Sequence, residues 1–232
     1  MKTLVIIPTY NEKENIQQIV PAVFLENPQV NILVVDDNSP DGTAQQVVLL
    51  QNKFVDQLYL LSRPGKQGLG KAYIAGFQWG LSKGYDVLVE MDADFSHRPR
   101  DLKLILQKIA VNDFVVGSRY VPGGETINWG ILRKIISRGG GIYSRLILGF
   151  PLQDWTGGFN AWKKPVLEKI KLDSVTSNGY SFQIELKYKA LKNGFRGVES
   201  PISFEDRRVG QSKMSLKIVL EAFYKVWQIR FY

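Results

Sequence analysis

The sequence predicts a three-layer α/β domain built around a mainly parallel sheet. Short apolar runs alternate with helical patterns through the first half of the 232-residue chain. The runs are apolar throughout instead of alternating between apolar and polar residues, which indicates strands covered by helices on both faces. Polar clusters directly follow three of these runs, at the strand ends where sheets of this class bind ligands.

Five strands and four helices are expected in the first half. The strands are expected at residues 4–7, 32–35, 57–61, 87–91 and 114–116. Between them, apolar residues recur with helical spacing at residues 13–25, 43–52, 70–80 and 100–110. This alternation is typical of repeated βαβ units.

The second half is less regular. A loop rich in Gly and Pro at residues 120–128 precedes a basic helix expected at residues 133–149. That helix contains Gly139-Gly140-Gly141, where we expect a break or a close approach of another segment, because three glycines weaken a helix. A helix is expected at residues 179–192 and a strand at 198–204. We predict one domain over residues 1–211 and a helical appendage over residues 212–232.

Composition limits the function. The net charge of +8 favours an anionic partner, whereas no groove-reading motif supports nucleic-acid binding. The absence of cysteine excludes disulfides and cysteine nucleophiles, and the single histidine, His97, excludes multi-histidine metal sites. We interpret His97 as a loop residue. With no signal peptide and no apolar stretch of about 18 residues, we expect a cytoplasmic protein without a membrane span.

Asp92 and Asp94 are the strongest candidates for chemistry. They follow the fourth expected strand, and Asp36 and Asp37 follow the second. Two carboxylates two residues apart can face one ligand if the backbone turns there, and hard oxygen ligands suit Mg²⁺ or Mn²⁺. A metal bridging carboxylates and a diphosphate would offset the charge that grows on a leaving group. A solvated acidic turn is the alternative, but the position at strand ends favours function.

Several motifs carry a family resemblance. The three at the strand ends are Pro8-Thr9-Tyr10-Asn11-Glu12, Asp36-Asp37-Asn38-Ser39-Pro40-Asp41-Gly42-Thr43 and Asp92-Ala93-Asp94. They resemble the opening blocks of family 2 inverting glycosyltransferases, which implies a GT-A (Rossmann-like) α/β/α fold. Later motifs resemble dolichyl-phosphate (polyprenyl-phosphate) mannosyltransferases: Gly68-Leu69-Gly70, Gly117-Ser118-Arg119-Tyr120, Arg133-Lys134-Ile135-Ile136-Ser137-Arg138-Gly139, Asp154-Trp155-Thr156-Gly157-Gly158-Phe159, Pro201-Ile202-Ser203-Phe204-Glu205-Asp206-Arg207 and Gly210-Gln211-Ser212-Lys213.

The resemblance implies roles for individual residues. It implies donor-binding residues Pro8, Tyr10, Glu12, Val35, Asp37, Asp92, Ala93, Asp94, Arg119, Arg207 and Lys213. It implies metal ligands Asp92, Asp94 and Ser96, acceptor-binding residues Arg119, Arg133 and Ser137, and catalytic residues Asp94, Arg119 and Arg207. One position departs from the family pattern: Asn160 stands where an arginine is common, so we expect different contacts on the acceptor side.

The implied reaction is inverting transfer of mannose from GDP-mannose to a dolichyl or polyprenyl phosphate. A phosphate monoester is largely dianionic near neutral pH, so it can attack the anomeric carbon without an obligatory general base. Three alternatives stay open: transfer of glucose from UDP-glucose, transfer to a saccharide hydroxyl with Asp154 as general base, and a non-catalytic nucleotide-binding module at a membrane.

The tail at residues 213–232 predicts how the protein meets a lipid substrate. Lys213, Lys217, Glu221 and Lys225 recur every four residues and form one polar stripe on an otherwise apolar helix. A wide apolar face with lysines and a tryptophan is typical of a helix in a membrane interface, and packing on the domain's own core is the alternative. We expect peripheral association with the cytoplasmic face of a membrane, with a small membrane-anchoring partner as an open possibility.

Overall fold

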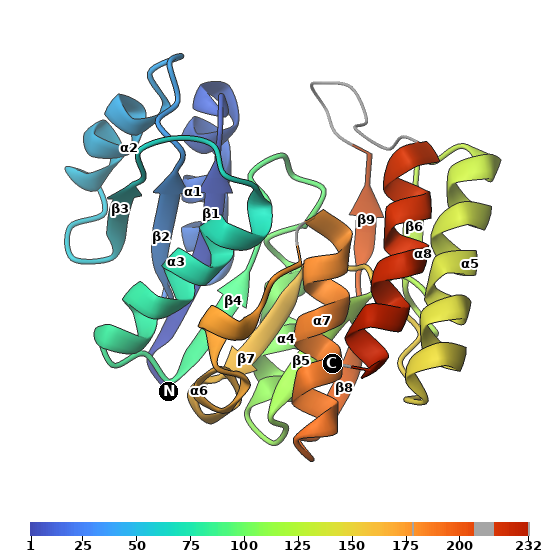
Figure 1. The fold of residues 1–232 in the computed structure, drawn as a ribbon. Helices are drawn as coiled ribbons and strands as arrows, with labels where there is room; N and C mark the ends of the chain where they lie inside the picture. Colours follow the sequence, from blue (N-terminus) through green and yellow to red (C-terminus); the bar gives the residue numbers. More distant parts are fainter. Residues whose placement is uncertain (178, 207–215, 232) are drawn as a thin grey trace.

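The computed structural model describes residues 1–177, 179–206 and 216–231, and of residues 216–222 the backbone alone. Its centre is a seven-stranded sheet in the order β3-β2-β1-β4-β7-β5-β8 (Figure 1). The strands are β1 (Thr3–Thr9), β2 (Asn31–Asp36), β3 (Leu58–Ser62), β4 (Val87–Glu90), β5 (Phe114–Ser118), β7 (Asn160–Lys163) and β8 (Gly197–Pro201). Neighbouring strands are parallel except where β7 pairs with β4 and β5, so the predicted mainly parallel sheet is confirmed.

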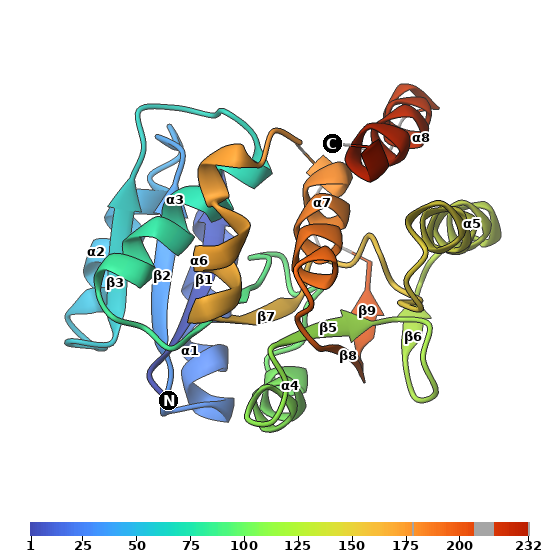
Figure 2. The same ribbon diagram turned by 60° about the horizontal axis from the view of Figure 1, so that its bottom comes forward.

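Helices cover both faces of the sheet, as predicted. One face carries α1 (Lys13–Glu26), α2 (Thr43–Gln51) and α4 (Asp101–Ile109), and the other carries α3 (Leu69–Ser82), α6 (Lys164–Ile170) and α7 (Gly179–Lys192) (Figure 2). Successive residues of each strand point to opposite faces, so Leu4 and Ile6 of β1 join one core cluster while Val5 and Ile7 join the other. Burial on both faces explains the uninterrupted apolar runs.

The second half differs from the sequence prediction in three places. The expected strand at residues 198–204 is two strands, because β9 (Ser203–Glu205) leaves the main sheet and pairs with β6 (Glu125–Ile127). Strand β6 lies inside a segment predicted as a loop, and β7 and α6 were not predicted. Strands as short as β6, β7 and β9 depend on tertiary pairing more than on local pattern.

Helix α5 (Ile131–Leu148) runs through the glycine triplet without a break. A Cβ at position 141 would lie 2.7 Å from the carbonyl oxygen of Gln153, so Gly141 permits a close backbone approach. Of the two expectations for this triplet, the close approach of another segment is therefore confirmed, and the break in the helix is wrong.

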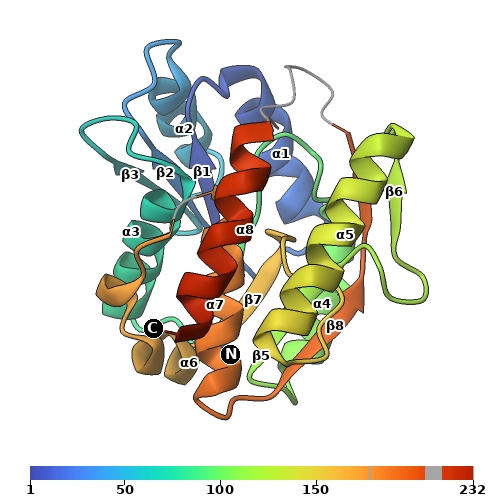
Figure 3. The ribbon, with the colours of Figure 1, turned by 45° about the vertical axis from the view of Figure 1, so that its right-hand side comes forward.

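The C-terminal helix α8 (Leu216–Phe231) lies beside α5 and packs on α7 (Figure 3). Val226 and Ile229 are buried, and the Tyr188 hydroxyl donates to the carbonyl oxygen of Arg230 at 3.2 Å. One face of the helix thus joins the domain core, as the alternative reading of the tail required. Among the described residues, no helix has the length and hydrophobicity needed to cross a bilayer.

Candidate functional site

The carboxyl ends of β1, β2 and β4 lie next to one another, and the polar motifs meet at this edge. Asp36 at the end of β2 accepts hydrogen bonds from the Thr9 hydroxyl at 2.9 Å and from the Ser39 hydroxyl at 2.6 Å. Asn11 and Asn38 both adopt positive φ angles, 61° and 56°, a conformation that asparagine tolerates better than most residues. The first two motifs therefore form one interlocked pair of turns.

Several residues predicted to bind the donor lie along this edge. The Arg63 guanidinium, which the sequence did not single out, donates to Asp37 at 2.7 Å, and both side chains are nearly buried. Burial raises the pKa of Asp37 above its ordinary value, although Arg63 acts in the opposite direction. Lys66 lies 4.3 Å above the exposed ring of Tyr10, so a cation and an aromatic face stand beside this pair.

Three further predicted donor-binding residues, Glu12, Pro8 and Val35, differ in their contacts and burial. Glu12 accepts a 2.6 Å hydrogen bond from the Asn15 amide, and its backbone N–H donates to the Thr43 hydroxyl at 3.1 Å. Pro8 pairs in register with Val35, whose side chain is fully buried in the core. Val35 can therefore meet a ligand only through its backbone.

The turn after β4 brings Asp92, Ala93 and Asp94 to the same edge. Phe95 adopts a left-handed φ of 62°, which reverses the chain directly after the second carboxylate. The Tyr73 hydroxyl donates to Asp92 at 3.2 Å, while the backbone N–H and the hydroxyl of Ser96 donate to Asp94 at 3.1 and 2.6 Å. Ser96, a predicted metal ligand, thus fixes the orientation of Asp94 in this structure.

His97 has a larger role in this turn than its interpretation as a loop residue implied. It lies in the loop but is buried, and its Nδ1 accepts the backbone N–H of Asp92 at 3.0 Å. Its ring stacks on Phe159 at 4.8 Å, and burial lowers its pKa, so the neutral ring holds the Asp92 backbone in place. A single histidine in a polar loop carries no sequence signal for such burial.

Arg119, at the end of β5, is buried against Asp154. Its Nε and Nη2 donate to the two carboxylate oxygens at 2.7 and 2.6 Å, and its backbone N–H donates to the same group at 3.0 Å. Burial acts to raise the pKa of Asp154, but the charge and hydrogen bonds of Arg119, together with the charge of Lys187, hold this pKa below its ordinary value. Asp154 therefore remains ionised and orients Arg119.

Arg119, Arg133 and Ser137, the predicted acceptor residues, are brought together by two aromatic side chains. The guanidinium carbons of Arg133 and Arg119 lie 3.9 and 5.4 Å from the centre of the Trp129 ring. The Tyr120 hydroxyl donates to the Ser137 hydroxyl at 2.6 Å, and the Tyr120 ring lies 5.3 Å from the guanidinium carbon of Arg119. Arg133 also pairs with Asp206 at 2.7 Å. Tyr120 appeared in a predicted motif without a role, and Trp129 was missed.

Residues 4–171 match the pattern of the family described as glycosyl transferase family 2. The chain belongs to glycosyl transferase family 2. It is 51% identical over 232 residues to the polyprenol monophosphomannose synthase of Mycolicibacterium smegmatis, covering 99% of this chain and 88% of the relative. It is 46% identical over 226 residues to the undecaprenyl-phosphate mannosyltransferase of Micrococcus luteus, covering 97% and 93%.

A solved structure of a Pyrobaculum calidifontis mannosyltransferase with GDP-mannose and Mn²⁺ shares the fold. The TM-score is 0.62 at 16% identity, over 99% of this chain and 73% of that one. The resemblance seen in the sequence motifs is therefore confirmed at the level of family and of fold. The predicted residues Arg207 and Lys213 lie outside the described part of the chain.

The donor set at the turn after β4 fits a divalent metal in this glycosyl transferase family 2 chain. The described residues hold no cluster of three or more His, Cys, Asp or Glu side chains that would enclose a metal by themselves. Asp92 and Asp94 supply hard carboxylate oxygens from a constrained turn. A site with few protein ligands suits Mg²⁺ or Mn²⁺ held jointly with diphosphate oxygens and water.

Proposed function

We propose that this family 2 enzyme transfers mannose from GDP-mannose to a polyprenyl phosphate with inversion, giving polyprenyl-phosphate mannose. The observation that carries the proposal is the aromatic-linked group of Arg119, Arg133 and Ser137 at the same end of the sheet as the Asp92–Asp94 turn. The Asp92–Asp94 turn, through a bound metal, suits a diphosphate, and the group of Arg119, Arg133 and Ser137 suits a second anion. The names of both relatives, which describe mannose and a polyprenyl phosphate, support this pairing.

The reaction needs no protein general base. A phosphate oxygen of the acceptor forms the bond to the anomeric carbon while the bond from that carbon to the GDP oxygen breaks. The electron pair leaves with the diphosphate, and attack from the opposite face inverts the configuration. Arg133 and Arg119 would align the attacking dianion through charge-assisted hydrogen bonds.

The contacts of Asp154 weaken the alternative of transfer to a saccharide hydroxyl. That reaction requires a general base, whereas Asp154 is fully buried, bonded to Arg119 through three N–H groups, and bonded to the Gly157 N–H at 2.9 Å. A carboxylate with a lowered pKa and this many donors is a poor proton acceptor.

Asp92 and Asp94 would hold a divalent metal, with Ser96 contributing directly or by orienting Asp94. When bound, the metal would stabilise the negative charge of the departing diphosphate. This chain's own residues prepare the site: Tyr73 and Ser96 orient the two carboxylates, and His97 fixes the backbone between them.

The buried pair of Asp37 and Arg63 would select the nucleotide base of the donor. A carboxylate beside a guanidinium presents both an acceptor and donors, which can match the edge of a base. The names of the two relatives at 51% and 46% identity, which both describe mannose, support mannose over the alternative of glucose.

We also propose that α5 and α8 together bring the enzyme to a membrane surface. On α5, the buried residues are Ser137, Gly141, Ser144 and Leu148, and Tyr143 and Ile147 also pack on the core, whereas five large apolar residues face outward. Ile131, Leu132, Ile135, Ile142 and Leu146 are exposed by 51–78%. This is the reverse of a helix that only covers a core.

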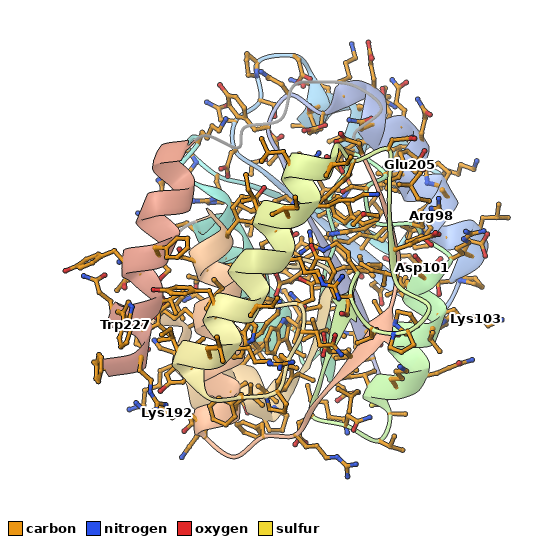
Figure 4. All side chains as sticks on the ribbon, turned by 90° about the vertical axis from the view of Figure 1, so that its right-hand side faces the viewer. Arg98, Asp101, Lys103, Lys192, Glu205 and Trp227 are labelled. Atoms are coloured by element: carbon orange, nitrogen blue, oxygen red, sulfur yellow. The ribbon has the colours of Figure 1, made fainter. Side chains whose placement is uncertain are left out.

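Helix α8 extends the same apolar surface. Phe223, Tyr224, Trp227 and Phe231 are exposed by 44–74%, and Figure 4 places Trp227 on the outer side of the helix. The ring of Phe223 contacts Tyr143 of α5 at 4.3 Å, which joins the two helices. Exposed Lys134, Arg138 and Arg145 add positive charge beside the apolar residues, a combination suited to anionic phospholipid.

One assay tests the proposed function. The purified protein is incubated with polyprenyl phosphate and a panel of radiolabelled nucleotide-sugars, and the lipid product is extracted. We expect label in the lipid phase from GDP-mannose and none from UDP-glucose. Label from UDP-glucose alone would favour the glucosyl alternative, and label only in a water-soluble saccharide would contradict the lipid acceptor.

A further inference from the structure

Lys187 on α7 is a buried cation that the proposed reaction does not use. Its side chain is fully buried, and its Nζ donates to the carbonyl oxygens of Asp154, Trp155 and Gly157 at 3.1, 3.1 and 2.8 Å. Burying an ammonium group is unfavourable unless its N–H groups are all bonded. Three carbonyl oxygens from one short loop meet that requirement.

Glu199 on β8 holds the same loop from its N–H side. One carboxylate oxygen accepts the backbone N–H of Gln153 at 2.9 Å, and the other accepts that of Asp154 at 2.9 Å. The loop at residues 153–157 is thus bound by a carboxylate at its N–H groups and by an ammonium at its carbonyl oxygens. Each charge faces the end of the peptide dipole that it attracts.

This loop carries the group that orients Arg119. Asp154 receives three N–H groups of Arg119, and the Thr156 hydroxyl lies 2.9 Å from Arg119 Nη2. We propose that Lys187 and Glu199 are positioning residues, which hold the 153–157 loop so that Asp154 and Thr156 fix the guanidinium of Arg119 for the acceptor. The role in acceptor alignment rests on the proposed function, whereas the hold on the loop does not.

Asn160 on β7 shares one of the carbonyl oxygens that Lys187 contacts. The Asn160 amide and Lys187 Nζ both donate to the carbonyl oxygen of Gly157, at 3.1 and 2.8 Å. Asn160 is also the position at which this chain departs from the arginine of the family pattern. Lys187 therefore supplies, from a neighbouring helix, a positive charge at the carbonyl group that Asn160 contacts without charge.

The test compares Lys187→Met with Lys189→Met. Lys189 lies on the same helix and is partly exposed, but its Nζ contacts Glu185 at 2.7 Å and Ser174 at 2.8 and 3.0 Å instead of the 153–157 loop. We expect Lys187→Met to lower kcat roughly tenfold or more with nucleotide affinity unchanged, and Lys189→Met to leave both unchanged. The double variant Lys187→Met with Arg119→Lys should lose less kcat/KM than the product of the two single losses, because Lys187 acts through Arg119. Multiplicative losses in a folded variant would overturn the proposal.

Amide hydrogen exchange separates this proposal from the proposed function. The N–H groups of Arg119 and Gly157 should exchange faster in Lys187→Met but not in Lys189→Met, whether or not lipid mannosylation is observed. Unchanged exchange at both amides would contradict the hold on the loop.

Two further variants cover the case in which Lys187→Met does not fold. Glu199 is only partly buried, and Glu199→Gln should reproduce a smaller loss in kcat with faster exchange at Gly157. The double variant Asn160→Arg with Lys187→Ala returns the charge to position 160 and should recover kcat and slow exchange. Wild-type behaviour of Glu199→Gln, together with no recovery in the double variant, would refute the positioning role.

Discussion

Arg119 and Asp154 form a two-point ion pair in the interior, with Nε and Nη2 of the arginine 2.7 and 2.6 Å from the two carboxylate oxygens. Neither side chain is more than 5% exposed. The pair joins the end of β5 to the loop before β7, and so connects the sheet to the predicted acceptor residues.

Removal of one partner should be more damaging than removal of both. Asp154→Leu leaves a buried guanidinium without its carboxylate, and we expect the free energy of unfolding to fall by about 3–5 kcal/mol. The double variant Arg119→Met with Asp154→Leu should lose less than Asp154→Leu alone, and therefore less than the sum of the single losses. Urea unfolding of the four proteins measures this, and additive losses would mean that the pair is not coupled.

Asp94→Ala should abolish sugar transfer while the fold remains intact. Asp94 is only 8% exposed, but it lies in the polar turn after β4 and accepts hydrogen bonds from Ser96 there, so its removal takes the proposed metal ligand away without opening the apolar core. Activity measured with added Mg²⁺ or Mn²⁺ and with a chelator provides the check, alongside circular dichroism. Full activity of the variant, or of the wild type in chelator, would contradict the metal role.

Arg133→Ala should raise the KM for polyprenyl phosphate and leave nucleotide binding nearly unchanged. The loss of one charge-assisted contact is expected to be about 1.5–3 kcal/mol, or roughly ten- to a hundredfold in kcat/KM. Lys103→Ala is the control, because it removes an exposed charge from α4, outside the predicted acceptor residues and the proposed membrane face. The affinity for GDP is measured by calorimetry. If it falls together with the affinity for polyprenyl phosphate, Arg133 belongs to the donor side of the site.

Replacement of Tyr224, Trp227 and Phe231 by serine should weaken binding to anionic liposomes about tenfold or more, because each aromatic ring contributes apolar area. Activity on a long-chain acceptor should fall, while a short water-soluble acceptor is used almost normally. The control replaces Val48, Leu49 and Val55, which are exposed by 51–67% near α2. Equal loss in both triple variants would show that apolar surface in general, and not this face, sets liposome binding.

The pH dependence of stability should reveal the titration of Lys187. Burial lowers its pKa to about 8 from an ordinary 10.5, so between these values the unfolded chain binds a proton that the folded chain does not. The free energy of unfolding should therefore gain a contribution that rises with pH from 8 to 10.5, by up to about 1.4 kcal/mol per pH unit. Lys187→Met should lack this rise. Parallel curves for the two proteins, measured by urea unfolding, would contradict the lowered pKa.

Local pattern was enough to predict the first half of the fold, because β1, β2 and β4 are buried on both faces and read as apolar runs. It was also enough for the cluster at their carboxyl ends, since parallel strands bring those ends to one edge. Strand β7 could not be predicted, because its four residues gain their partners from β4 and β5, far away in the chain. Arg63, Trp129 and Lys187 were missed for a related reason: each acts through a contact that only the tertiary fold creates.

The placement of β7 also orders the assembly of the sheet in time. Strands β1 to β4 and their helices use residues from the first 90 positions, so they can pair as soon as that length of chain is available. Strand β5 pairs with β7 and β8, and β7 alone among the described strands joins this group to β4. The two groups cannot close into one sheet until residues 160–163 have been synthesised, and such distant pairings form slowly. During synthesis the edge of β4 therefore stays unpaired over about 70 residues of further elongation, and an unpaired strand edge is prone to aggregation.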